Sequence, residues 1–168
     1  MSQILEPLPD LMIEPLVRRA LEEDLGRAGD VTSTAVALPQ ETLRARFVAR
    51  KPGRVAGLQP ARITAGLVDT ALTFRLISND SAAVSAGAAI AEISGPARSV
   101  LTAERTALNF LTHLSGIATL TAQYVDVVKG TNARIAATRK TLPGLRALQK
   151  QAVIAGGGWP HRYGLDDA

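Results

Sequence analysis

A run of positive charges and hydrogen-bond donors lies near the C-terminal end of the sequence. Arg139 offers a planar guanidinium group that fits a carboxylate or a phosphate with two hydrogen bonds, and Lys140 beside it adds a compact charge. Thr138 and Thr141 flank this pair with hydroxyl groups that can donate to anion oxygens. These residue types predict an anion-binding site, and a solvated basic turn is the ordinary alternative.

The elements expected around this run place it where an anion site could form, but without further support the solvated turn remains the favoured interpretation. Residues 133–138 are typical of a buried strand, and residues 143–155 of a helix. The C-terminal ends of strands face the active site in parallel α/β folds. The helix that follows would add the partial positive charge of its N-terminus.

A second donor-rich segment follows that helix. Gly156, Gly157 and Gly158 allow unusual backbone angles or a close approach to a ligand, and His161 and Arg162 supply two more donors. The alternative is a glycine helix cap followed by a loop whose histidine has a structural role.

Other candidate groups are sparse. Arg105 follows Glu104 on an expected helix, where such a pair is usually a surface charge, and His113 lies among leucines as a core or boundary histidine would. The two histidines and the absence of cysteine give no ligand set for a metal. We therefore predict no metal ligand in this chain.

The rest of the sequence predicts an α/β fold. A helix over 10–25 is expected to be capped by Asp10 and closed by Gly26, and a turn is expected to follow at 29–33. A break at Ser115-Gly116 is expected to divide a long helical stretch in two. The other expected helices are 60–71, 98–114 and 117–128, and the strands are 43–49, 54–56, 73–77 and 89–93.

Composition narrows the class of partner. The net charge is +4, but the basic residues are scattered and no aromatics interleave with them, which disfavours nucleic acid. No stretch approaches the roughly 20 apolar residues of a membrane span, and no signal peptide is visible. We expect a cytoplasmic protein that binds small anions.

Five segments in order resemble the quinolinate phosphoribosyltransferase family. They are Glu23-Asp24-Leu25 with Gly29-Asp30-Val31-Thr32, then Val55-Ala56-Gly57, then residues 101–119, then residues 138–146, and last residues 155–165. The resemblance implies an N-terminal α+β sandwich-like domain over residues 1–112. Residues 113–168 would begin an open, TIM-like α/β barrel, which looks truncated because a barrel needs about 250 residues.

The resemblance also implies an activity. The family transfers phosphoribose from PRPP to quinolinate, with Mg²⁺, and releases CO₂ and pyrophosphate to give nicotinate mononucleotide for NAD biosynthesis. The Mg²⁺ ligands would lie beyond residue 168 or come from PRPP. The residues that the resemblance implies for substrate binding are Arg105, Thr138, Arg139, Lys140, His161 and Arg162. Lys140 and Arg105 would be catalytic, and Arg105 would reach the partner subunit's site in a homodimer.

Four positions depart from the family pattern. Ala137 stands where an acidic residue is common and Pro160 where an asparagine is usual, and Gln151 and Ile154 also differ. Ala137 and Pro160 are similar to a related branch associated with molybdenum transport. The alternatives to the phosphoribosyltransferase are therefore that branch, or a truncated non-catalytic chain that dimerises or binds anions.

Overall fold

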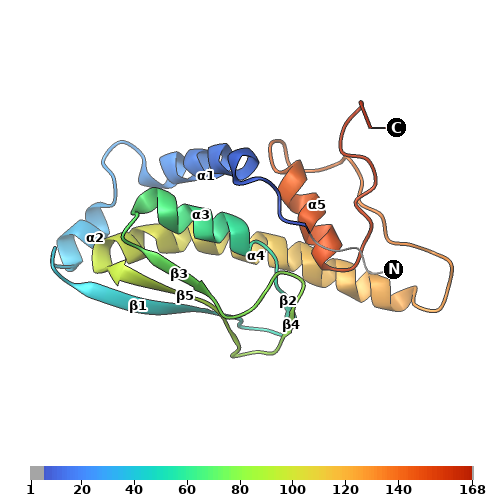
Figure 1. Cartoon of the computed structure of the whole chain (residues 1–168), viewed down its shortest axis with the longest axis horizontal. Coiled ribbons are helices and arrows are strands. Elements are labelled where there is room, and N and C mark those ends of the chain that lie inside the picture. Colours follow the sequence, from blue (N-terminus) through green and yellow to red (C-terminus); the bar gives the residue numbers. More distant parts are fainter. Residues whose placement is uncertain (1–5, 168) are drawn as a thin grey trace.

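The computed structural model describes residues 6–167, and it has a mixed α/β fold (Figure 1). Its elements, in order, are α1 (Asp10–Leu25), α2 (Val31–Val36), β1 (Thr42–Val48), β2 (Gly53–Arg54), α3 (Leu58–Val68), β3 (Thr73–Leu76), β4 (Ala83–Val84), β5 (Ala89–Pro96), α4 (Ala97–Val127) and α5 (Arg146–Ala155). The predicted fold class is confirmed, and the described residues form no closed barrel.

A three-stranded antiparallel sheet forms one layer, in the order β1-β5-β3. Alternate residues on its inner face, among them Phe47, Phe74 and Ile93, join a core shared with α3 and α4. The alternation of apolar and polar residues along β1 is the direct result of one buried face.

The long helix α4 runs unbroken for 31 residues, so the predicted break at Ser115-Gly116 is wrong. The Ser115 hydroxyl is turned inward, where it accepts from Ala56 N at 3.0 Å and lies 3.1 Å from Ala56 O. Gly116 faces open space. Packing on both sides of this point outweighs the cost of about 1 kcal/mol that a glycine brings to a helix.

A second core lies where α1 and α5 pack against α3 and the C-terminal half of α4 (Figure 1). It contains Val17 of α1, Leu114 and Ala118 of α4, and Leu148 of α5. The two cores are therefore joined by α4, which contributes residues to both.

Two predictions near the N-terminus need correction. Pro9, and not Asp10, is the N-cap of α1, because the Asp10 carboxylate is used by α3: it accepts from Gln59 Nε2 and Arg62 Nη2, both at 2.7 Å. The segment expected as a turn at 29–33 begins the short helix α2, capped by Asp30, whose carboxylate accepts from Ser33 N at 2.8 Å. Gly26 closes α1 as predicted.

The predicted strand over 133–138 is not formed. A single parallel bridge joins Ala136 to Trp159, because no other strand lies beside this segment in the described part of the chain. Within residues 6–167, no helix has the length and apolar character required to cross a bilayer.

Candidate anion-binding site

The Ala136–Trp159 bridge brings the two donor-rich segments together. Ala137 N donates to Trp159 O, and Trp159 N donates to Ile135 O, both at 2.8 Å. Because the bridge is parallel, both segments continue from it in the same direction. Thr138 and His161 thus each stand two residues beyond the bridge on neighbouring stretches of chain.

The glycine segment holds this arrangement against α4. A Cβ on Gly156 would lie 2.4 Å from Ala118 O and 2.6 Å from Thr121 Cβ, and one on Gly158 would lie 2.9 Å from Thr121 Cγ2. Gly157 has φ of 88°, which favours glycine. The glycines therefore serve close packing and a tight turn, and Gly156 is the C-cap of α5, which agrees with the helix-cap alternative given for them.

The first donor-rich segment holds Arg139 with one buried donor atom that is not hydrogen-bonded within residues 6–167. The loop is held by its own backbone and hydroxyls, with Lys140 N donating to Thr138 Oγ1 at 3.1 Å and Thr141 N donating to Arg139 O at 3.0 Å. The Nε atom of Arg139 is buried and has no hydrogen-bond partner among the described residues. Thr138 and Lys140 are exposed. A buried guanidinium donor without an acceptor is costly, and an anion would satisfy it.

His161 adopts a strained backbone with φ of 52°. Its Nδ1 lies 2.7 Å from Arg162 N, which donates to it. Because Nδ1 accepts, the neutral ring carries its proton on Nε2, which makes Nε2 a donor. The side chains of His161 and Arg162 are exposed, and the His161 ring centroid lies 5.2 Å from that of Trp159.

Three residues of α5 support this site, and the sequence analysis did not single them out for it. Gln149 Oε1 accepts from Leu142 N at 3.1 Å, and Arg146 Nη1 donates to Tyr163 O at 2.9 Å. Lys150 is buried and donates from Nζ to Pro160 O. No sequence signal separated Lys150 from an ordinary helix lysine, since three successive buried residues, 148–150, match no helical period.

The buried position of Lys150 shifts the pKa of its amine. Burial lowers the pKa of the Lys150 amine, the positive charge of Arg146 lowers it further, and Asp167 acts in the opposite direction. Burial, with the charge of Asp167, also raises the pKa of the Tyr163 hydroxyl. The loop that carries His161 and Arg162 is thus held by two basic side chains of α5, the buried Lys150 and the half-buried Arg146.

Arg105 is not brought to this site within one chain. It is exposed on α4, more than four helical turns before Thr121, where the glycine segment packs, and this corresponds to about 24 Å along the helix. Its surroundings are the anchoring contacts of α2, in which Thr102 Oγ1 donates to Asp30 at 2.8 Å and Arg98 Nε donates to Ala37 O at 2.9 Å.

His113 is exposed rather than part of the core. Its Nε2 lies 2.9 Å from the Gln149 amide nitrogen, so it is hydrogen-bonded at the edge of α4 and α5. Across residues 6–167, no three His, Cys, Asp or Glu side chains gather as a metal site would require.

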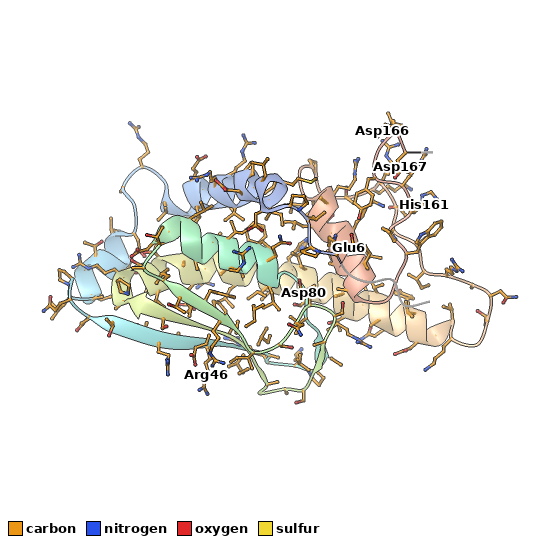
Figure 2. All side chains as sticks on the ribbon, in the orientation of Figure 1. Glu6, Arg46, Asp80, His161, Asp166 and Asp167 are labelled. Atoms are coloured by element: carbon orange, nitrogen blue, oxygen red, sulfur yellow. The ribbon has the colours of Figure 1, made fainter. Side chains whose placement is uncertain are left out.

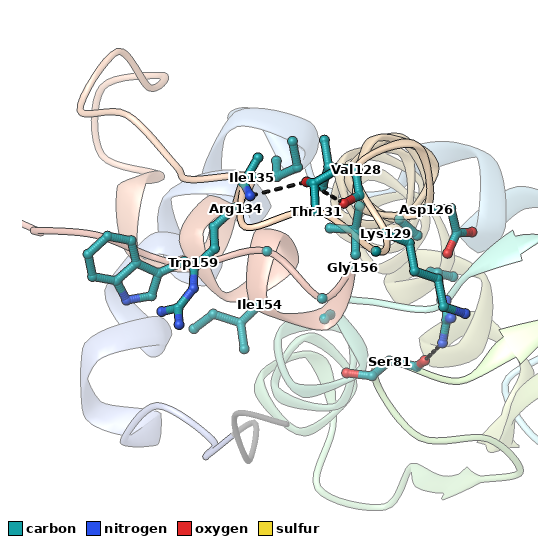
Figure 3. Close-up of a pocket in the computed structure, with 18 residues that line it drawn as sticks. Ser81, Asp126, Val128, Lys129, Thr131, Arg134, Ile135, Ile154, Gly156 and Trp159 are labelled. Atoms are coloured by element: carbon teal, nitrogen blue, oxygen red, sulfur yellow. Dashed lines mark hydrogen bonds between the residues drawn. The ribbon is translucent and has the colours of Figure 1, made fainter. Parts of the chain in front are cut away.

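A hollow of about 790 Å³ lies beside the glycine segment but apart from the predicted site residues. Figure 3 shows the Trp159 indole at one end and Lys129 and Ser81 at the other. None of the six predicted binding residues lines it. The predicted binding residues therefore lie outside this hollow, and most of their side chains are exposed.

Comparison with known families matches the chain from residue 30 onward. The model described as "Quinolinate phosphoribosyl transferase, N-terminal domain" matches residues 30–115, and the corresponding C-terminal domain matches residues 117–168. The two matches meet inside α4.

Named relatives agree with this match. A nicotinate-nucleotide pyrophosphorylase [carboxylating] of Mycobacterium leprae is 45% identical over 153 residues, which is 90% of this chain and 54% of the relative. A probable enzyme of the same name from Synechocystis is 42% identical over 95% of this chain and 54% of its own length. The chain thus spans about half the length of these curated relatives.

Solved structures show the same arrangement. The nicotinate-nucleotide pyrophosphorylase of Francisella tularensis superposes with a TM-score of 0.92 at 36% identity, covering 100% of this chain and 60% of that one. A related structure from Streptococcus pyogenes has a TM-score of 0.92 at 37% identity, over 97% of this chain and 57% of that one. The names of these relatives favour the pyrophosphorylase over the molybdenum-associated branch.

Proposed function

Because this chain belongs to the quinolinate phosphoribosyltransferase family, we propose that it forms the quinolinate-binding part of an enzyme that makes nicotinate mononucleotide. The full reaction joins the ring nitrogen of quinolinate to the anomeric carbon of PRPP, with loss of pyrophosphate and then of CO₂. We further propose that the enzyme works in the cytoplasm and acts on small anions, without nucleic acid or membrane partners.

The unpaired Nε of Arg139 is the observation that carries this proposal. Among the described residues only two buried side-chain atoms lack a partner, Thr106 Oγ1 and Arg139 Nε, and the arginine is the charged one. A carboxylate placed beside Arg139 would accept from a donor that is already desolvated. Hydrogen bonds of this kind, with both partners charged, are roughly twice as strong as neutral ones.

The second carboxylate of quinolinate has its own donors in this arrangement. His161 and Arg162 follow the parallel bridge on one segment as Arg139 does on the other, and their side chains are exposed. Quinolinate carries its carboxylates on adjacent ring carbons, so two neighbouring clusters of donors suit it. Thr138 and Lys140 would stand beside the ring, and Lys140 would supply charge near the reacting centre.

The protein's part in the transfer would be mainly positioning. Fixing the carboxylates orients the ring nitrogen toward the anomeric carbon, and positive charge around the site stabilises the departing pyrophosphate. The described residues do not fit a magnesium site, since they gather no carboxylate cluster. We propose that Mg²⁺ is bound through PRPP phosphates and residues outside this chain.

A homodimer is part of the proposal. Arg105 is exposed and far along α4 from the other donors of its own chain, so it would serve the site of a second copy. Arg105→Ala and Arg139→Ala would then each be inactive as homodimers of the complete enzyme, whereas mixed dimers would regain one working site. Absence of recovery on mixing would show that Arg105 acts within its own subunit.

Calorimetric titration tests the binding proposal directly. Quinolinate is titrated into the 168-residue chain, with nicotinate, which lacks one carboxylate, as the matched control ligand. We expect quinolinate to bind measurably more tightly than nicotinate. Equal affinities, or binding of neither ligand, would contradict the proposed site in this chain.

A further inference from the structure

Lys150 is the largest fully buried side chain in the described structure, with 1% of its surface exposed. No carboxylate of residues 6–167 lies within ion-pair distance of it. Burying an ammonium group without a counter-ion costs several kcal/mol in effective desolvation. A side chain that is retained at such a cost calls for a specific contact that an apolar residue could not make.

The contacts of Lys150 all lie on one short segment of chain. Its Nζ donates to Pro160 O and lies 5.3 Å from the centre of the Tyr163 ring, within range of a cation–π interaction. One helical turn earlier, Arg146 Nη1 donates to Tyr163 O at 2.9 Å. These two basic side chains of α5 thus hold both ends of residues 160–163, and we call this set of contacts the α5 clamp.

The clamped segment contains two of the residues proposed to bind quinolinate. His161 and Arg162 lie between the two anchored carbonyls, and their own side chains are exposed. His161 is held at φ of 52°, a conformation that costs of order 1–3 kcal/mol and persists only where surrounding contacts enforce it. The clamp supplies those contacts through the backbone carbonyls of Pro160 and Tyr163, while the side chains of His161 and Arg162 stay exposed and free for a ligand.

We propose that Lys150 is a positioning residue that fixes the directions of His161 and Arg162, and with them the preference for a dicarboxylate over a monocarboxylate. This inference rests on the proposed function above. An apolar residue at 150 would leave the buried Pro160 carbonyl without this donor, and the segment would relax. Both the neutral and the charged amine can donate to that carbonyl.

The first test needs no substrate. Trp159 is the only tryptophan in the chain and precedes the clamped segment directly, so its fluorescence reports on this loop. Lys150→Met keeps the apolar stem and removes the donor, and Lys51→Met, at an exposed turn lysine, is the matched control. We expect the acrylamide quenching constant of Trp159 to rise about twofold in Lys150→Met because the loop opens locally, and to stay unchanged in Lys51→Met.

The outcome is decisive where circular dichroism shows that the variant is folded. Unchanged quenching in folded Lys150→Met would overturn the clamp. If that variant does not fold, Arg146→Met, which removes the other anchor from a half-buried position, is expected to raise the quenching of Trp159 in the same direction. Unchanged quenching in Arg146→Met would then overturn it.

The second test measures selectivity. The ratio of quinolinate to nicotinate affinity does not depend on the fraction of folded protein, because misfolding lowers both alike. We expect Lys150→Met to weaken quinolinate binding about tenfold, since misplaced donors lose their alignment, and to weaken nicotinate binding less. A preserved ratio would overturn the positioning role. If the wild-type chain binds neither ligand, that role falls with the proposed function, while Trp159 quenching still decides whether the clamp exists.

Discussion

Two groups of basic side chains lie well apart in the molecule, as Arg46 and His161 show in Figure 2, and they differ in what neutralises them. The sheet cluster consists of Arg44, Arg46 and Arg75 on the outer face of the sheet, arranged around the buried Glu92 at 3.3–3.4 Å. The loop cluster consists of Arg139, Lys140, His161 and Arg162. It has no carboxylate within ion-pair distance in the part of the chain that the structure describes.

This difference separates a structural role from a binding role. Burial raises the pKa of Glu92, but the Arg46 hydrogen bond and the charges of Arg44 and Arg75 outweigh it, so the net pKa is lowered. The arginines of the sheet cluster are therefore neutralised by Glu92, a carboxylate of the same chain. The loop cluster keeps a buried donor on Arg139 without an acceptor among the described residues, and we propose that its anion is the substrate. The number of arginines alone would not have distinguished the two clusters.

The largest effect that we predict follows from Arg139. Arg139→Ala removes the desolvated donor from the loop cluster and should weaken quinolinate binding on the order of a hundredfold, as truncating one partner of a buried charge pair does. Arg46→Ala in the sheet cluster is the matched control, with affinity expected to stay within about twofold because it is remote from the site. Calorimetry of both variants checks this. A comparable loss in Arg46→Ala would erase the distinction between the clusters.

Glu92→Gln should reverse this pattern. The substitution leaves three arginines facing one another without their carboxylate, so we expect a lower Tm and an unchanged affinity for quinolinate. The fall in Tm should exceed that of Arg44→Ala, which leaves two partners for Glu92. Thermal unfolding followed by circular dichroism measures both variants. A Tm equal to that of the wild type would show that Glu92 is not the organising charge of the sheet cluster.

The stability that Glu92 contributes should depend on pH. Because its pKa is lower in the folded protein than the ordinary 4.5, this contribution is fully present above pH 4.5 and is lost as the pH falls through the folded-state value. The difference in Tm between the wild type and Glu92→Gln should therefore be constant near neutral pH and shrink in acid. A difference that grows in acid would contradict the assigned direction.

The smallest effect is expected from a pair that is exposed on both sides. Arg62 Nη2 and Asp10 Oδ2 lie 2.7 Å apart, but about half of each side chain is open to solvent. Arg62→Ala should lower the free energy of unfolding by about 0.5 kcal/mol, because water screens such pairs. Urea unfolding in low and high salt would measure it, and a loss as large as that of Glu92→Gln would mean that burial is not what separates these pairs.

The sequence predicted the sheet better than the long helix. Strand alternation around Phe47 and Ile93 follows from one buried face, which a local pattern reports. The continuity of α4 depends on partners distant in sequence, since Ser115 bonds to Ala56 and Gly53 lies so near Thr119 that a Cβ would come within 2.5 Å of its hydroxyl. No local pattern contains these contacts.

The same limit applies to the candidate site. The residue types at Arg139, His161 and Arg162 allowed anion chemistry but also a basic turn and a structural histidine, and the family resemblance favoured the first. The role of Lys150 could not be predicted, because it depends on where the chain returns after Gly158. The sequence left the glycines open between ligand approach, unusual backbone angles and a helix cap, and only the positions of Thr121 and Ala118 show that Gly156 packs against α4.

The single helix shared by two cores also limits how the gene for this protein can vary. Leu111 of α4 belongs to the core under the sheet, and Leu114 belongs to the core around α5, so the passage from one to the other takes less than one helical turn. Inserting or deleting one residue there would rotate every later position by about 100°. The surface that receives Gly156 would then face away from it. Substitutions can accumulate along α4, but its length between the two cores is fixed.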